Sequence, residues 1–238
     1  MKPILVILPT FNEAENISLI IRWILNISDR YGIPLNILVI DDNSPDGTAR
    51  IVYREYRLDK RVGLIIRYGV RGYASAVYRG LKYGYYKGYK HIIVMDADLQ
   101  HNPIYIPRML EAARYGCSLV VASRYVDGGG IVGWSILRRM ISIGANILAR
   151  LILRIDIRDS TSGYRLYDWR ALSILVKHGF RSSGFAIQPE SIYLLKRRGL
   201  KICEVPFIFV NRRRGRSKLN IGTLIDYTLN LFRLRVFE

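Results

Sequence analysis

The chain has 238 residues, a hydrophobic fraction of 50% and a formal net charge of +18. This length suits one large α/β domain or two small ones, and the apolar fraction is sufficient for a buried core, which excludes a disordered chain. The excess of positive charge predicts partners that carry phosphate. Nucleic acid, anionic lipid and phosphorylated small molecules all meet that description, and charge alone does not choose among them.

The cysteines and the hydrophobic stretches argue against secretion and against membrane spanning. Cys117 and Cys203 lie far apart and match no metal or redox spacing, so we expect two separate structural thiols. The apolar run at residues 4–8 is too short for a signal-peptide core. Because arginines and lysines interrupt every long hydrophobic stretch, we expect a chain that has no transmembrane domain and can lie on a membrane without crossing it alone.

The first half of the chain alternates short apolar runs with amphipathic segments. Buried strands are expected at residues 4–8, 35–40, 62–66, 92–95 and 119–122. Helices are expected between them, at residues 15–26, 48–56, 74–83 and 104–114, with Asn12 and Asp46 as candidate N-caps. This alternation predicts an α/β fold with a mostly parallel, doubly wound sheet flanked by helices. In such sheets, ligands bind beyond the carboxyl ends of the strands.

The second half contains two amphipathic segments rich in arginine. Residues 135–158 combine an apolar stripe with basic side chains, and residues 135–155 contain no acidic side chain. This pattern is typical of a helix that lies on an anionic membrane surface, although a core helix with a solvated basic face gives the same spacing. Residues 219–238 repeat the pattern and suit a membrane, a partner or the protein core.

An acidic pair follows the strand expected at residues 92–95. Asp96 and Asp98 are one residue apart and can hold a hard divalent cation that also binds a diphosphate, while Gln100 can add a neutral oxygen ligand. An isolated Asp-x-Asp is usually a solvated turn. Its position after a buried strand, facing two other polar loops, favours a metal site.

The two other polar loops follow the first and second strands, at residues 9–13 and 41–48. One carboxylate of the Asp41-Asp42 pair can accept hydrogen bonds from a base or from ribose hydroxyls. The other explanation is that Asp41 or Asp46 orders the turn and caps the next helix, which we expect for Asp46.

A basic cluster at residues 212–218 follows a strand expected at residues 202–210. Arginine forks suit phosphate oxygens, so this cluster is a candidate anion site, although a charge run of this kind is often a solvated face or a nucleic-acid patch. The chain has no Walker-type Gly-Lys-Ser/Thr and no GxGxxG after the first strand. The sequence therefore lacks the motifs of nucleotide-hydrolysing enzymes and of dinucleotide-dependent oxidoreductases.

Seven ordered stretches together resemble the family-2 glycosyltransferases, and within them the dolichol-phosphate mannosyltransferase group of polyprenyl-phosphate sugar transferases. The matching stretches are residues 9–13, 41–48, 96–100 with Pro103, 123–125, 159–165, 204–206 and 212–219. The resemblance covers nearly the whole chain.

The resemblance implies a single GT-A domain, a Rossmann-like arrangement in which residues 1–126 bind the nucleotide sugar and residues 127–238 bind the acceptor. The implied donor-binding residues are Pro9, Thr10, Phe11, Glu13, Ile40, Asp42, Asp96, Ala97, Asp98 and Gln100. Asp96, Asp98 and Gln100 would hold Mg²⁺ or Mn²⁺. The implied acceptor-phosphate residues are Arg124, Arg138, Ser142, Arg212 and Lys218, and the residues expected to carry the reaction are Asp98, Arg124, Arg138 and Arg212.

The sequence departs from the family pattern in two places. The family often has Gly-x-Gly where this chain has Gly72-Tyr73-Ala74, and Phe11 replaces a frequent tyrosine, which removes a hydroxyl near the base. Many relatives also continue after the Ser-Lys-Leu motif into transmembrane helices. Here, attachment to the cytoplasmic face of a membrane is expected to be peripheral, through amphipathic helices or a small membrane-anchoring subunit.

The expected reaction transfers mannose from GDP-mannose to dolichyl or another polyprenyl phosphate, inverts the anomeric centre and gives dolichyl β-D-mannosyl phosphate. A phosphate monoester already carries about −1.5 to −2 charges at neutral pH, so no catalytic base is required, and Glu190 is a weak candidate for one. The alternatives are transfer of glucose from UDP-glucose, a scaffold that has lost the chemistry, and a basic nucleic-acid-binding protein. The acidic rim argues against nucleic acid, although 17 tyrosines and 7 phenylalanines offer stacking surfaces.

Overall fold

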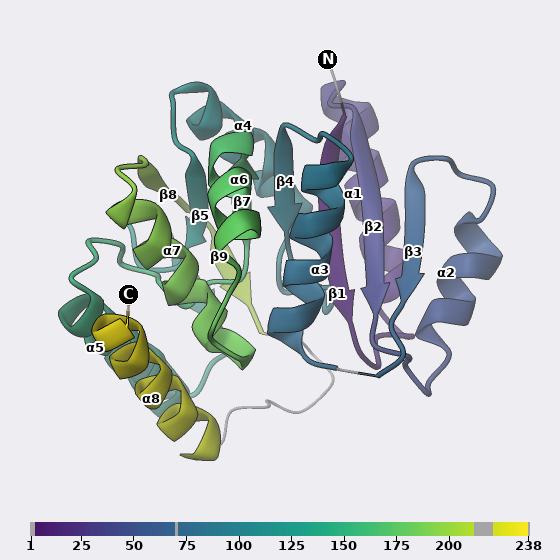
Figure 1. Ribbon diagram of the computed structural model, residues 1–238. Coiled ribbons are helices and arrows are strands. Elements are labelled where there is room, and N and C mark those ends of the chain that lie inside the picture. Colours follow the sequence, from purple (N-terminus) through teal and green to yellow (C-terminus); the bar gives the residue numbers. More distant parts are fainter. Residues whose placement is uncertain (1–2, 70, 212–220, 238) are drawn as a thin grey trace.

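A seven-stranded sheet forms the centre of the protein (Figure 1). The computed structural model describes residues 3–69, 71–211 and 221–237. The strand order is β3-β2-β1-β4-β7-β5-β8, and only β7 runs antiparallel to its neighbours. The strands are β1 (Ile4–Thr10), β2 (Leu35–Asp41), β3 (Val62–Ile66), β4 (His91–Val94), β5 (Leu119–Ser123), β7 (Arg165–Asp168) and β8 (Ile202–Pro206). The expected mostly parallel α/β sheet is therefore confirmed.

Helices cover both faces of the sheet because the strands are apolar on both sides. Leu5 and Ile7 of β1 pack against the layer of α3 (Tyr73–Tyr86), α6 (Trp169–His178) and α7 (Ile187–Arg197). Val6 and Leu8 face the other layer, which contains α1 (Ile17–Tyr31), α2 (Thr48–Tyr56) and α4 (Ile106–Arg114). Short 3₁₀ turns, η1 (Pro103–Tyr105) and η2 (Gly184–Ala186), precede α4 and α7. Figure 1 shows the first layer in front of the sheet.

Helix α3 lies close to the sheet because two of its glycines face the strands. A Cβ atom at Gly84 would stand 2.2 Å from Cδ1 of Ile92, and one at Gly80 would stand 2.7 Å from side-chain atoms of Ile7. Side chains at these two positions would push the helix outward. The glycines thus fix the depth of α3, whose N-terminal residue Tyr73 reaches the carboxyl edge of the sheet.

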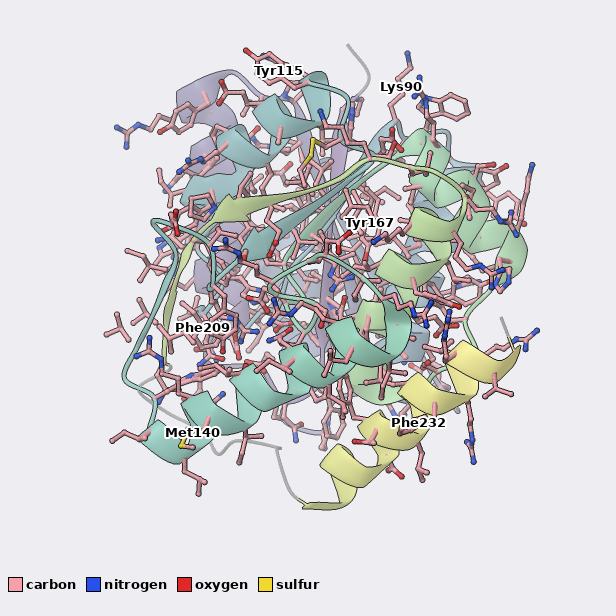
Figure 2. All side chains as sticks on the ribbon, turned by 90° about the vertical axis from the view of Figure 1, so that its left-hand side faces the viewer. Lys90, Tyr115, Met140, Tyr167, Phe209 and Phe232 are labelled. Atoms are coloured by element: carbon pink, nitrogen blue, oxygen red, sulfur yellow. A yellow bond between two sulfur atoms is a disulfide. The ribbon has the colours of Figure 1, made fainter. Side chains whose placement is uncertain are left out.

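Two further helices, α5 (Ile136–Leu153) and α8 (Ile221–Phe237), pack side by side at one end of the molecule (Figures 1 and 2). The expected helix at residues 135–158 is shorter than predicted, because Arg154 takes a left-handed conformation with φ of 51° and ends it. In the part of the chain that the structure describes, no helix combines the length and apolar character that a bilayer crossing requires.

The strand expected at residues 202–210 is two strands that belong to different sheets. β8 ends at Pro206, and β9 (Ile208–Val210) pairs in parallel with β6 (Gly130–Val132). Phe207 lies between β8 and β9 and is almost fully buried. The basic cluster at residues 212–218, which follows β9 in the sequence, lies outside the described residues.

The prediction of two separate thiols was wrong, because Cys117 and Cys203 form a disulfide with a Cα–Cα distance of 5.8 Å. Cys117 precedes β5 by two residues, and the parallel pairing of β5 with β8 places Val120 opposite Cys203. The 86-residue separation hides this proximity in the sequence. The bond links β8, at the edge of the sheet, to β5 (yellow in Figure 2).

We expect the double variant Cys117→Ser/Cys203→Ser to be less stable than the oxidised protein. Closing a loop of 86 residues lowers the entropy of the unfolded chain by an amount worth about 4.6 kcal/mol. Urea unfolding of the variant should therefore show a lower midpoint, with a slope that is steeper because the unfolded chain without the cross-link exposes more surface. Wild-type protein unfolded in reductant is the matched control and should behave like the variant. Equal midpoints for oxidised and reduced wild type would contradict the prediction.

Candidate active site

A cavity of about 540 Å³ opens at the carboxyl ends of the parallel strands β1, β2 and β4 and extends to α5 and α8. It brings together twelve of the predicted site residues: Pro9, Thr10, Phe11, Glu13, Asp42, Asp96, Ala97, Asp98, Gln100, Arg124, Arg138 and Ser142. Ile40, a predicted donor residue, is fully buried in the hydrophobic core instead of lining the cavity, because its side chain points toward the α3 layer. Arg212 and Lys218 lie outside the described residues.

The neighbouring carboxylates of Asp41 and Asp42 have different partners. Asp41 is fully buried, and its Oδ1 accepts a hydrogen bond of 3.0 Å from the hydroxyl of Thr10. Asp42 lines the cavity, pairs with Arg67 (Nε to Oδ1, 2.6 Å) and accepts the Gly72 N–H on Oδ2 at 2.7 Å. Asp41 therefore orders the turn, while Asp42 joins the loop after β2 to the loop that begins α3.

Neither candidate N-cap occupies the cap position of its helix, although Asp46 bonds to the first residue of α2. The carboxylate of Asp46 accepts hydrogen bonds from the N–H and hydroxyl of Thr48 and from the N–H of Ala14. Partial burial opposes ionisation, but these bonds outweigh it and lower the pKa of Asp46. Asp46 therefore orders the turn before α2, but the N-cap position is Gly47, so the prediction of Asp46 as the N-cap was wrong. Asn12 does not cap α1, because it lies in a left-handed loop conformation with φ of 61° and Asn16 occupies the cap position.

An aromatic ring and a guanidinium contact each other where the loops after β1 and before α3 line the cavity. The guanidinium of Arg71 lies 5.9 Å from the ring centroid of Phe11, and both residues line the cavity. A planar base can stack on such a pair without the hydroxyl that the tyrosine of relatives would supply. Arg71 was not predicted as a site residue, because its contact with Phe11 joins loops that follow different strands.

The turn after β4 presents oxygen ligands that suit a hard divalent cation. Asp98 Oδ1 accepts the backbone N–H of Gln100 at 3.2 Å, and Leu99 between them has a left-handed φ of 66°. No group of three or more His, Cys, Asp and Glu side chains able to hold a metal occurs among the described residues. Mg²⁺ commonly binds through one or two carboxylates together with water and substrate phosphates. Asp96 and Asp98, with the amide oxygen of Gln100, fit that requirement.

His101 is a buried neighbour of this turn that the sequence did not identify. Its Nδ1 accepts the backbone N–H of Asp96 at 2.9 Å, and its ring stacks on Tyr164 with centroids 5.1 Å apart. Burial lowers the pKa of His101 to about 4, so the imidazole is neutral at physiological pH. The histidine thus fixes the backbone at Asp96 without adding a charge.

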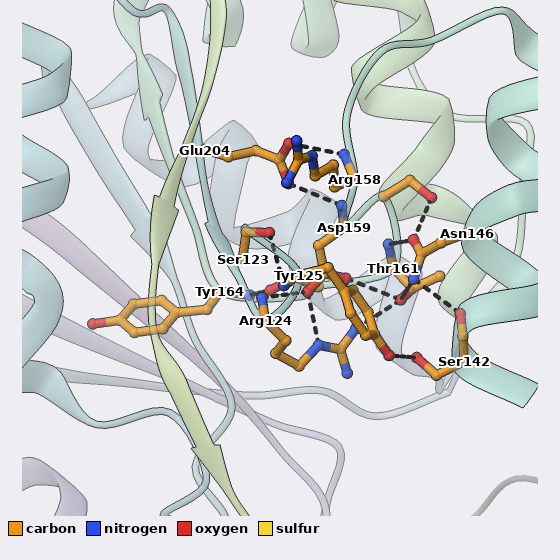
Figure 3. A network of polar contacts seen from close by, with 12 residues as sticks. Ser123, Arg124, Tyr125, Ser142, Asn146, Arg158, Asp159, Thr161, Tyr164 and Glu204 are labelled. Carbon is orange, nitrogen blue, oxygen red and sulfur yellow. Dashed lines mark hydrogen bonds and ion pairs between the residues drawn. The ribbon is translucent and has the colours of Figure 1, made fainter. Parts of the chain in front are cut away.

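Arg124, which lines the cavity, forms a buried ion pair with Asp159 (Figure 3). Arg124 donates through Nη2 to Asp159 Oδ1 at 2.6 Å, and through Nε and its backbone N–H to Oδ2 at 2.7 and 2.9 Å. Nη2 also donates to the Thr161 hydroxyl at 2.8 Å. Burial opposes ionisation of Asp159, but the charge and hydrogen bonds of Arg124 outweigh this effect and lower the pKa of Asp159. Among the described residues these bonds use Nε and Nη2, which leaves Nη1 for an anion in the cavity.

Asn211 connects Gln100, in the turn after β4, with Arg138 of α5, and sequence reasoning missed it. Its Oδ1 accepts hydrogen bonds from Gln100 Nε2 at 3.3 Å and from Arg138 Nη1 at 3.2 Å. The Arg138 guanidinium also lies 4.1 Å from the ring centroid of Trp134. Asn211 immediately precedes the basic cluster at residues 212–218, which lies outside the described residues.

The inward face of α5 is polar where it meets the cavity. Ser142 accepts a hydrogen bond of 2.8 Å from the hydroxyl of Tyr125, and Asn146 bonds to Ser160 and Thr161 in the loop that carries Asp159 (Figure 3). Helix α5 is therefore connected to the Arg124 network through hydroxyls and an amide.

Glu190, the weak candidate for a catalytic base, stabilises a loop away from the cavity. It is fully buried, does not line the cavity, and accepts the backbone N–H groups of Arg181 and Ser182 at 2.7 and 2.9 Å. A carboxylate in this position orders the loop before α7.

The sequence matches the glycosyl transferase family 2 over residues 5–175. It is 35% identical over 231 residues to an undecaprenyl-phosphate mannosyltransferase of Micrococcus luteus, an alignment that covers 97% of this chain and 93% of that protein. It is 38% identical over 237 residues to a dolichol-phosphate mannosyltransferase of Pyrococcus furiosus, covering 98% of this chain and 64% of that protein. The chain therefore belongs to glycosyl transferase family 2 and is a glycosyltransferase.

A solved structure shows the same fold. Glucosyl-3-phosphoglycerate synthase from Mycobacterium tuberculosis, in complex with Mn²⁺, UDP and phosphoglyceric acid, superposes with a TM-score of 0.72 and 19% identity. The match covers 99% of this chain and 79% of that chain. The predicted GT-A architecture is thereby confirmed. Neither the relatives nor this structure supports the alternative of a nucleic-acid-binding protein.

Proposed function

We propose that the protein transfers mannose from GDP-mannose to the phosphate of a membrane polyprenol, such as dolichyl phosphate, and that the reaction needs Mg²⁺ or Mn²⁺. The observation that carries the proposal is the single cavity in which the Asp96–Asp98 turn faces Arg124 and Arg138. One end suits a nucleoside diphosphate, and the other suits a second phosphate. The mannosyltransferase relatives support the choice of sugar and of polyprenyl phosphate.

On the donor side, the loops of residues 1–126 would hold the nucleotide sugar. Phe11 and Arg71 would stack on the base, while Asp96, Asp98 and Gln100 would hold a divalent cation beside the diphosphate. Such a cation would stabilise the negative charge of the leaving nucleoside diphosphate. Asp42 acts indirectly in this proposal, because its carboxylate is engaged by Arg67 and Gly72.

On the acceptor side, residues 127–238 and Arg124 would align the polyprenyl phosphate. A phosphate oxygen attacks the anomeric carbon, and the bond from that carbon to the diphosphate oxygen breaks, so an α-linked donor gives a β-linked product. Arg124 and Arg138 reduce the repulsion between the two anions. The acceptor oxygen carries no proton that must be removed, which agrees with the buried position of Glu190 away from the cavity.

The outward face of α5 supports membrane binding at the entrance to this site. Small and polar residues such as Ser142 and Asn146 face inward, whereas Ile136 is 81% exposed and Leu137 is 69% exposed. A core helix with a solvated face would show the opposite distribution. Figure 2 shows Met140 of α5 and Phe232 of α8 on the outer side of the two helices. We place the enzyme on the cytoplasmic face of the membrane, bound through these two helices.

The double variant Leu137→Glu/Met140→Glu tests this membrane surface. We expect its binding to vesicles of phosphatidylcholine and phosphatidylglycerol to fall about tenfold or more, because two exposed apolar anchors are lost and negative charge is added. Leu58→Glu is the matched control, since Leu58 is exposed near α2, outside the proposed membrane surface. Co-sedimentation measures binding. Equal loss in both variants, or no loss in either, would contradict the assignment.

The choice of donor is tested with radiolabelled nucleotide sugars. Purified protein, a polyprenyl phosphate and Mg²⁺ are incubated in parallel with GDP-mannose and with UDP-glucose, and label in organic-extractable lipid is measured. Label from GDP-mannose supports the proposal. Label only from UDP-glucose would retain the mechanism and assign the alternative glucosyltransferase activity, and label from neither would contradict both.

A further inference from the structure

The hydroxyl of Tyr73 lies in the cavity with its proton unused. Tyr73 is the first residue of α3 and lines the cavity. Its oxygen accepts a hydrogen bond of 2.9 Å from Nε2 of Gln188, and its ring packs on Phe185 with centroids 5.5 Å apart. Among the described residues, no acceptor is within hydrogen-bond distance of the Tyr73 proton. The hydroxyl can therefore donate one hydrogen bond to a bound ligand.

The position of this hydroxyl relates it to the donor sugar. A Cβ atom at Gly163 would stand 2.6 Å from the hydroxyl of Tyr73 and 3.7 Å from Oδ1 of Asp96. The hydroxyl and the carboxylate therefore face the same small space beside the Gly163 backbone, which a side chain would fill. If the diphosphate binds beside Asp96, as proposed above, a sugar attached to it can reach this part of the cavity, which Tyr73 and Gly163 also line.

The orientation of Tyr73 is fixed by its surroundings. The residue before it, Gly72, has a φ of 125°, and its N–H donates to the carboxylate of Asp42. Phe185 packs against the ring of Tyr73, and Gln188 donates a hydrogen bond to its hydroxyl. Burial and the nearby negative charge of Asp96 raise the pKa of Tyr73 well above its usual value, so the phenol keeps its proton.

We propose that Tyr73 is a specificity-determining residue that donates a hydrogen bond to one hydroxyl of the donor sugar. The inference rests on the proposed function and adds the residue that recognises the sugar. Tyr73 occupies the variable position of the Gly-x-Gly pattern, and the residue that departs from this pattern is the next one, Ala74. A site that bonds to a hydroxyl discriminates strongly against a sugar that lacks it.

The test is the variant Tyr73→Phe, which retains the ring and removes only the hydroxyl. Steady-state kcat/KM is measured for GDP-mannose and for its 2-, 3-, 4- and 6-deoxy analogues, with wild type and variant. We expect the variant to lose about tenfold with GDP-mannose, the size of one hydrogen bond. With one deoxy analogue, the kcat/KM of the wild type should fall by a similar factor relative to GDP-mannose. The kcat/KM of the variant should be the same for that analogue and for GDP-mannose. GDP affinity, measured by calorimetry, should be the same in both proteins.

Tyr78→Phe is the matched control, because Tyr78 is on the same helix and bonds to the carbonyl of Val176 outside the cavity. This variant should keep wild-type kcat/KM. The role of Tyr73 would be overturned by any of three results, while the proposed function stands. The first is a wild-type kcat/KM in Tyr73→Phe. The second is a loss from the variant that adds to the loss from every deoxy analogue, and the third is a fall in GDP affinity as large as the fall in kcat/KM. Absence of mannosyl transfer by the wild-type enzyme would instead overturn the proposed function and this inference with it.

Discussion

Replacing Asp98 with asparagine is expected to lower kcat for mannosyl transfer by about 10²–10³-fold, the range measured when one group that stabilises developing charge is removed. The substitution keeps the shape of the turn, in which Asp98 accepts the N–H of Gln100, but removes the negative charge that would attract a divalent cation. Initial rates at saturating donor and Mg²⁺ measure the effect, and circular dichroism checks that the variant is folded.

Asp156→Asn is the control for Asp98→Asn, because Asp156 is a largely exposed carboxylate that pairs with Lys196 outside the cavity. It should retain wild-type kcat. If Asp98→Asn keeps metal-dependent turnover within a few-fold of wild type, the assignment of the metal to the Asp96–Asp98 turn is wrong.

Replacing Asp159 with alanine is expected to lower the free energy of unfolding by about 3–5 kcal/mol, because the guanidinium of Arg124 would stay buried without its counter-charge. Activity should fall as well, since Asp159 holds Arg124 through three hydrogen bonds. Urea unfolding monitored by fluorescence measures the stability change.

The double variant Arg124→Met/Asp159→Leu separates the two effects of this pair. Replacing both charges with apolar side chains removes the unpaired charge, so we expect it to recover much of the stability lost in Asp159→Ala. It should remain inactive, because the guanidinium that would bind the acceptor phosphate is absent. A double variant as unstable as Asp159→Ala would show that the cost does not come from the unpaired charge.

The sheet and the position of the site could be predicted from local patterns. Apolar runs of strand length alternating with helical spacing specify a parallel sheet, and the rule that ligands bind beyond its carboxyl edge selected the turn at Asp96 and Asp98. The first and last residues of α2 are those predicted from the sequence. The single strand predicted at residues 202–210 is instead two strands, because Phe207 is buried at the point where the chain changes sheets.

The remaining features depend on contacts between distant segments, which local patterns do not contain. The disulfide needs the pairing of β5 with β8, and the bridging position of Asn211 needs β9 to lie beside β6. Asp41 and Asp42 are adjacent in sequence, and only their partners in the fold distinguish the buried turn residue from the one that lines the cavity. The proposed role of Tyr73 likewise depends on its proximity to Gly163 and Gln188, which lie about a hundred residues further along the chain.

The chemical identity of the lipid product tests the central claim most directly. The purified protein is incubated with GDP-mannose and a polyprenyl phosphate, in Mg²⁺ and in EDTA, and the organic-extractable product is examined by mass spectrometry and NMR. The account predicts a polyprenyl mannosyl phosphate with a β-linked sugar in Mg²⁺ and no product in EDTA. An α-linked product, an equal yield in EDTA, or no mannosyl lipid under either condition would contradict it.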